Sequence, residues 1–185
     1  MSKNYRYMWI GLFIVTFHIN SVYYQLLPSF LGWFLVAFGV AGLCDKTGLL
    51  SWKNGSKLVS VLCILTFIDY IMTISNRQIT HAYWFIVITS IIELLFLYNM
   101  LQATTEMFQK AGKKQSAIWN ERILTRYSIL HIIGLLLLCK NWADYSGLEN
   151  DLVSVYMVGL RVFIIFRIMR IKKLCRLGKI ERVRG

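Results

Sequence analysis

An all-α fold, a bundle of six membrane-spanning helices, is predicted by the composition, the apolar runs and the distribution of positive charge. Hydrophobic residues make up 57% of the 185-residue chain and charged residues 16%, whereas soluble domains average roughly 45–50% and about 25%. The mean hydropathy is +0.54. These values exclude a disordered chain, a coiled coil and an ordinary soluble enzyme. They favour a polytopic membrane protein with a single integral membrane domain, residues 1–185.

Six apolar runs are the candidate spans, since a membrane helix needs about 20 mostly apolar residues, with a range near 17–25. The runs cover residues 7–19, 29–44, 57–74, 82–101, 127–139 and 152–168. The first and the fifth are short. The second begins directly after Pro28, a residue type favoured where helices start. A basic tail, residues 169–185, follows the last run.

Positive charge predicts the orientation of these spans. Most of the 21 Lys and Arg residues lie before the first run, between the second and third, between the fourth and fifth, or after the sixth. Only Arg77 and Lys140 fall in the other loops, while Arg161 and Arg167 lie in the last run. An excess of positive charge in cytoplasmic loops orients membrane proteins. We therefore expect a multi-pass membrane protein with both termini in the cytoplasm.

The same charge pattern predicts the partners. A net charge of +12 could indicate nucleic acid, but the basic residues flank apolar runs, so we expect no nucleic-acid partner. The expected partners are the lipid bilayer, with anionic headgroups at the cytoplasmic face, and possible oligomer or membrane-protein contacts. Tryptophans near the predicted span ends favour an interfacial belt. They are Trp9, Trp52 and Trp119 on the inner side and Trp33, Trp84 and Trp142 on the outer side.

Ionisable residues at membrane depth are the leading functional candidates, because each costs about 2.5–3.5 kcal/mol on insertion scales. Four are clear: Glu93, Arg161, Asp69 and His131. Glu93 and Arg161 each lie near the centre of a span, so the two opposite charges are most cheaply accommodated by facing each other. Two interpretations stay open, a structural ion pair that fixes helix packing and a substrate or ion site at the midplane.

Polar side chains also share faces on the third and fifth spans. At about 100° per residue, Thr66 and Tyr70 fall on one stripe with Cys63 and Thr73, and Asp69 lies beside it. His131 follows Tyr127 and Ser128 at helical spacing. The candidate substrate- or ion-binding residues are Glu93, Arg161, Asp69, His131, Tyr70 and Thr66. Interhelical hydrogen bonding is the simpler interpretation of the stripe.

Catalytic and metal-binding motifs are missing from the sequence. It contains no H-E-x-x-H, no G-x-S-x-G and no glycine-rich phosphate loop. The four cysteines are scattered, without C-x-x-C spacing. We expect no enzymatic activity, no cofactor and no metal. A nucleophilic pair of Cys63 with His131 is conceivable, but nothing in the sequence orients either residue.

The segment Leu27–Trp33 (LPSFLGW), with Gly39, Gly42 and Leu43 after it, resembles a stretch in uncharacterised small multi-pass membrane proteins of Firmicutes. Those proteins have Leu-Pro-Asp-Phe-Ile-Gly-Tyr followed by an aliphatic run and Gly-Leu. This chain has Ser29 in place of the acidic residue and Trp33 in place of tyrosine. The resemblance covers about 17 residues. It implies a bacterial origin, and with it a place in the bacterial cytoplasmic membrane. Physically, the segment predicts a helix entry followed by small residues that permit close helix packing.

Two functional hypotheses follow. The first is a small membrane protein that binds or transports a small molecule or ion through a polar midplane site. The alternative is a non-transporting accessory, immunity or assembly protein that acts through helix–helix contacts with a membrane partner. An outward-open polar cavity that reaches Glu93 would favour the first, and a dry, fully paired core the second. A cluster of His, Asp and Cys side chains around one open pocket would instead favour an intramembrane enzyme.

Overall fold

The computed structural model describes residues 1–17, 28–75, 83–140 and 148–176, and all regular structure in these ranges is α-helical. The predicted all-α fold is confirmed. The six helices are α1 (Ser2–Thr16), α2 (Ser29–Thr47), α3 (Leu50–Ile74), α4 (Tyr83–Lys110), α5 (Lys114–Lys140) and α6 (Leu148–Arg176).

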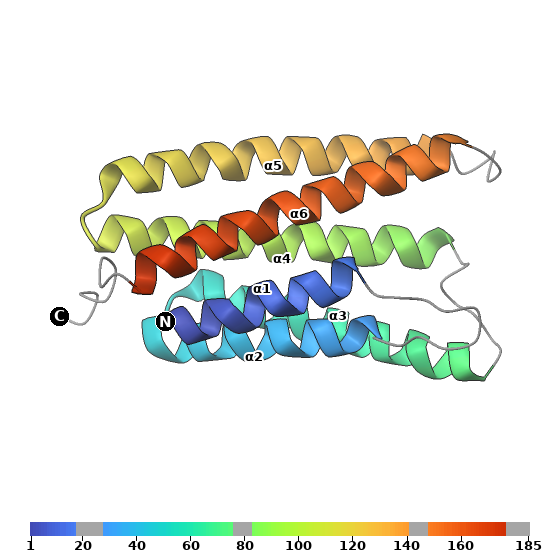
Figure 1. Cartoon of the computed structure of the whole chain (residues 1–185), viewed down its shortest axis with the longest axis horizontal. Coiled ribbons are helices and arrows are strands. Elements are labelled where there is room, and N and C mark those ends of the chain that lie inside the picture. Colours follow the sequence, from blue (N-terminus) through green and yellow to red (C-terminus); the bar gives the residue numbers. More distant parts are fainter. Residues whose placement is uncertain (18–27, 76–82, 141–147, 177–185) are drawn as a thin grey trace.

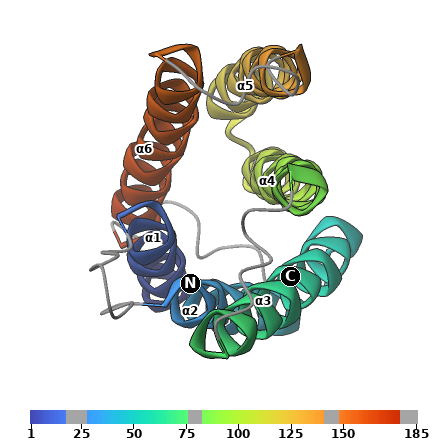
Figure 2. The ribbon, with the colours of Figure 1, turned by 90° about the vertical axis from the view of Figure 1, so that its right-hand side faces the viewer.

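The helices form a closed ring in which each packs against its neighbours in sequence and α6 packs against α1 (Figure 2). Successive helices run in opposite directions (Figure 1). Consequently α1 begins and α6 ends at the same end of the bundle, which also carries the short α2–α3 and α4–α5 connections. We call this the terminal end. The two basic segments between the predicted spans, residues 45–57 and 102–126, lie toward the terminal end.

Five helices, α2 to α6, are long and apolar enough to cross a membrane, so the chain is a small multi-pass integral membrane protein. Their outward faces carry large apolar side chains such as Phe34, Phe38 and Phe166. Helix α1 has 15 residues, about 22 Å at 1.5 Å per residue, which is less than the roughly 30 Å hydrocarbon core. Residues 18 and 19 of the predicted first span lie outside the described residues.

Helices α1 and α2 approach closely because glycines line their contact. A Cβ atom on Gly32 would lie 2.6 Å from the carbonyl oxygen of Gly11, and one on Gly39 would lie 2.7 Å from that of Asn4. Real Cβ atoms essentially never come so close to a neighbour. Gly32 and Gly39 therefore permit the close helix packing that the sequence predicts for this segment.

The interior of the bundle is filled by side chains from several helices. Tyr5 lies against Thr104 and Met107, and the Trp52 indole N–H donates to the Met107 sulfur at 3.5 Å. Trp33 packs edge-on against Phe96 with ring centroids 6.0 Å apart. Trp52 and Trp33 are thus core residues, which corrects their predicted place in an interfacial belt.

Trp84 and Trp119 are exposed and remain compatible with such a belt, whereas Trp142 lies outside the described residues. Trp33 and Trp52 lie on helix faces that pack inside the bundle, whereas Trp84 and Trp119 lie on exposed faces. An indole fits an apolar core when its N–H finds an acceptor, as that of Trp52 does.

Helices α4 and α5 extend well beyond the predicted spans 82–101 and 127–139. The basic segment between those spans, expected as a loop, is helical except for residues 111–113. The chain reverses at Gly112, whose φ of +71° suits glycine. No proline or glycine interrupts the segment elsewhere, so the helices continue past their apolar parts.

Candidate functional site

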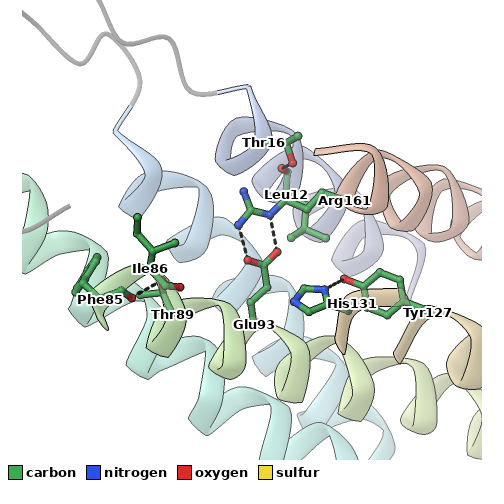
Figure 3. A network of polar contacts seen from close by, with 9 residues as sticks. All are labelled: Leu12, Thr16, Phe85, Ile86, Thr89, Glu93, Tyr127, His131 and Arg161. Carbon is green, nitrogen blue, oxygen red and sulfur yellow. Dashed lines mark hydrogen bonds and ion pairs between the residues drawn. The ribbon is translucent and has the colours of Figure 1, made fainter. Parts of the chain in front are cut away.

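Glu93 of α4 and Arg161 of α6 form a bidentate ion pair near the middle of the apolar spans (Figure 3). Arg161 Nε donates to Glu93 Oε1 at 2.6 Å, and Nη2 donates to Oε2 at 2.5 Å. The Glu93 side chain is only 2% exposed, while Arg161 keeps 24% of its side chain accessible. Two parallel N–H···O bonds fix both position and orientation. The pair therefore joins two helices that are not neighbours in the ring.

His131 of α5 lies beside this pair, with its ring between Glu93 and Tyr127 in Figure 3. The Tyr127 hydroxyl and His131 Nδ1 are 3.0 Å apart and share a hydrogen bond. His131 is buried, and its ring also interacts with the backbone of Ser90 on α4. Polar groups from α4, α5 and α6 thus meet at one depth.

The polar stripe of α3 lies elsewhere. Thr66 donates to the carbonyl oxygens of Leu62 and Cys63 in its own helix at 2.8 and 3.2 Å. Tyr70 packs on Phe30 of α2, with ring centroids 5.2 Å apart. The stripe therefore packs toward α2.

Asp69 is buried on α3. No described contact joins Asp69, Tyr70 or Thr66 to Glu93 or Arg161. Of the six candidate residues, the structure brings together Glu93, Arg161 and His131 and leaves the three from α3 apart.

A second polar network, which the sequence did not predict, joins α4, α5 and α6 nearer the terminal end. The buried Asn120 amide nitrogen donates to the Leu101 carbonyl at 2.9 Å and to the Thr105 hydroxyl at 2.8 Å. Its carbonyl oxygen accepts from Arg167 Nη2 at 3.0 Å and from Nε at 3.3 Å. The Arg167 guanidinium also stacks on Trp119, 4.3 Å from the ring centroid. One asparagine therefore connects three helices.

A signal for this network exists in the sequence. Arg167 is the second arginine of the last span, and Asn120 and Trp119 precede the fifth span in a segment that was expected to be a loop. Recognising that segment as helical places Asn120 on the same face as Ile123, Leu124 and Tyr127, which are all buried. The error in the helix boundary therefore concealed the network.

Metal-ligating side chains do not gather in the described part of the chain, where no three His, Cys, Asp or Glu residues could hold one ion. Cys63 Sγ contacts the Phe30 carbonyl at 3.8 Å, and no described contact joins it to His131. The chemistry available at the midplane is therefore charge pairing and hydrogen bonding by Glu93, Arg161, His131 and Tyr127.

Comparisons with protein families, with curated proteins and with solved structures find no match to this chain.

Proposed function

We propose that this protein binds a small polar solute or ion at the midplane cluster of Glu93, Arg161 and His131, and that it serves transport across the bacterial cytoplasmic membrane. The observation that carries the proposal is the spare capacity beside a buried ion pair. Arg161 uses two of its five N–H groups on Glu93 and stays partly accessible. His131 lies next to the pair and adds a further polar side chain to the cluster.

The placement of the cluster supports this proposal. Ionisable residues inside a membrane are rare, and they commonly line substrate or ion pathways. Transporter sites often lie near the bilayer midplane, between helices that move relative to one another. An anionic or zwitterionic solute suits the cluster, because its carboxylate would compete with Glu93 for the Arg161 guanidinium.

A second candidate function has its own supporting observation. Both carboxylate oxygens of Glu93 are taken by Arg161, so in this state neither charge is left without a partner. A paired, buried site of this kind suits an accessory, immunity or assembly protein whose helices dock on a membrane partner. In both cases we propose that the terminal end faces the cytoplasm, because positive charge is concentrated there.

The experiment is mass spectrometry of what co-purifies with the full chain in mild detergent. We would compare the wild type with the double variant Glu93→Gln/Arg161→Met and with Asn99→Ala as a control. Among the described residues, the Asn99 side chain bonds only the backbone of its own helix. A small solute enriched with the wild type and the control, and lost from the double variant, is the expected result. The same small molecules in all three samples would refute the midplane site. A membrane protein retained by all three, without any such solute, would support the accessory role instead.

A further inference from the structure

Helix α6 crosses the bundle obliquely, and this opens a cleft beside α5. In Figure 1 its first turns lie next to α5, whereas its last turns lie near the start of α1. The two helices therefore diverge toward the terminal end. The resulting cleft has a volume of about 660 Å³ and is lined entirely by α5 and α6. That volume is within the usual range of small-molecule sites, roughly 300–1,000 Å³.

Four arginines surround the part of the cleft nearest the terminal end, Arg122 and Arg126 from α5 and Arg167 and Arg170 from α6. None of the residues that line the cleft is acidic. Arg167 is held by Asn120. Among the described residues, the other three have no carboxylate within ion-pair distance. The acidic side chain of Glu121 lines a smaller, separate cavity together with Arg122 and Arg126.

Trp119 orders the arginines of α6. Its ring is contacted by the guanidinium groups of Arg167 and Arg170, at 4.3 and 4.7 Å from the centroid. Cation–π contacts of this kind hold a guanidinium in place while leaving its N–H groups free to donate. Trp119 is itself 44% exposed, as expected of an indole at headgroup depth.

The deeper part of the cleft is apolar. Leu130, Leu160, Phe163 and Phe166 line it, and Phe163 and Phe166 continue onto the exposed outer surface of α6. These residues belong to the membrane-spanning parts of α5 and α6. A ligand in the cleft would therefore meet positive charge toward the membrane surface and hydrocarbon toward the bilayer centre.

We propose that this cleft binds one anionic phospholipid from the leaflet at the terminal end. The phosphodiester would accept hydrogen bonds from Arg122, Arg126 and Arg170, and an acyl chain would lie along Phe163 and Phe166. Basic pockets between transmembrane helices have this chemistry, and guanidinium groups match phosphate oxygens geometrically. A soluble acidic peptide fits less well, because it would leave the apolar part of the cleft uncovered.

The test is native mass spectrometry of the full chain in detergent, titrated with dioleoylphosphatidylglycerol or dioleoylphosphatidylcholine. The cleft variant is Arg122→Gln/Arg126→Gln/Arg170→Gln. Its matched control is Lys46→Gln/Lys53→Gln/Lys110→Gln, which removes the same charge from exposed positions near the same end. We expect one phosphatidylglycerol bound in preference to phosphatidylcholine, an affinity loss of about tenfold or more in the cleft variant, and a much smaller loss in the control. Equal losses would mean diffuse attraction to a basic surface, and equal binding of both lipids would also overturn the proposal.

Two further arms separate a lipid from a free phosphate. Phe166→Ser should weaken phosphatidylglycerol binding, whereas Leu136→Ser should not, since Leu136 is equally exposed at 64% but lies outside the cleft. Glycerol 3-phosphate, which carries the phosphate without acyl chains, should not displace the lipid at millimolar concentration. Displacement by glycerol 3-phosphate, or identical effects of the two serine variants, would refute the lipid assignment.

Discussion

Arg161 and Glu93 are 68 residues apart in sequence, and their side chains meet in two parallel hydrogen bonds inside the helical ring. Because α4 and α6 are not adjacent in the ring, the pair holds together helices that share no backbone contact. An ion pair at this depth is retained either for packing or for binding, and the two roles predict different mutant behaviour.

Removing one member of the pair should destabilise the protein strongly. Glu93→Gln or Arg161→Met leaves the other group buried without its partner, which typically costs about 3–5 kcal/mol. Replacing both groups should recover much of that loss, because an apolar or neutral pair requires no charge burial. Thermal unfolding of the two single variants and the double variant in detergent measures this coupling. Additive single effects would show that the two side chains do not stabilise each other.

A charge swap separates the two roles of the pair. Glu93→Arg with Arg161→Glu keeps the attraction but exchanges the positions of the two charges. If the pair only fixes packing, the swapped protein should unfold close to the wild-type temperature and keep every co-purifying molecule. If it binds a solute, we expect a folded protein that has lost the solute, because the free donors of Arg161 would then be displaced from His131.

Glycine at position 32 is predicted to be required for the α1–α2 contact. Gly32→Ala would place a methyl group 2.6 Å from the Gly11 carbonyl oxygen, and overpacking of this kind typically costs about 1–3 kcal/mol. Gly159→Ala in α6 is the matched control, since nothing lies within 4 Å of its added Cβ. We expect Gly32→Ala to lower the melting temperature and Gly159→Ala to leave it unchanged or raise it. Equal effects would indicate that α1 and α2 separate without penalty.

The sequence was sufficient to predict the helical bundle because apolar runs of membrane length leave few other folds. It also indicated that Glu93 and Arg161 could face each other, since each lies near the centre of a span, but it left open whether they form a structural pair or a binding site. Hydropathy could not predict where α4 and α5 end, because a helix continues past its apolar part until a residue such as Gly112 reverses the chain.

The positions of the other candidates depended on the rotation of each helix about its axis, which the sequence specifies poorly. Helix α3 carries apolar residues on most of its surface, so the pattern did not show that Tyr70 packs on Phe30 of α2. For the same reason it did not show that Thr66 bonds its own backbone. Trp52 was predicted to be interfacial because it lies within the basic segment 45–57, close to the start of the predicted third span, yet it is fully buried.

The topology predicts which positions react with a membrane-impermeant thiol reagent. In a cysteine-free background, single cysteines at Lys53 and Lys113 should be protected in intact cells and become reactive after permeabilisation. Cysteines at Gln25 and Arg77, which lie outside the described residues, should react from outside. Both termini should behave like Lys53, because α1 begins and α6 ends at the same end of the bundle. External labelling at Lys113 would invert the proposed orientation.

Asn120 should be among the most sensitive polar positions in the chain. Its side chain makes two donor and two acceptor contacts with Leu101, Thr105 and Arg167. Hydrogen bonds to a charged group contribute about 1.5–3 kcal/mol, and Asn120→Ala would also leave the buried Arg167 guanidinium without its acceptor. We therefore expect Asn120→Ala to lower the free energy of unfolding by at least about 1.5–3 kcal/mol, and Asn120→Asp to be tolerated better, because a carboxylate still accepts from Arg167.

The control for Asn120 is Asn99→Ala, which removes one bond to the carbonyl of Leu95 in the same helix and should change stability by less than about 0.5 kcal/mol. The double variant Asn120→Ala/Arg167→Met distinguishes a shared network from two independent contacts. If Asn120 acts mainly by holding Arg167, the double variant should be more stable than Asn120→Ala alone, since no buried charge remains without an acceptor. A double variant that is less stable by the full sum of both single effects would mean that Asn120 and Arg167 stabilise the α4–α5–α6 junction separately.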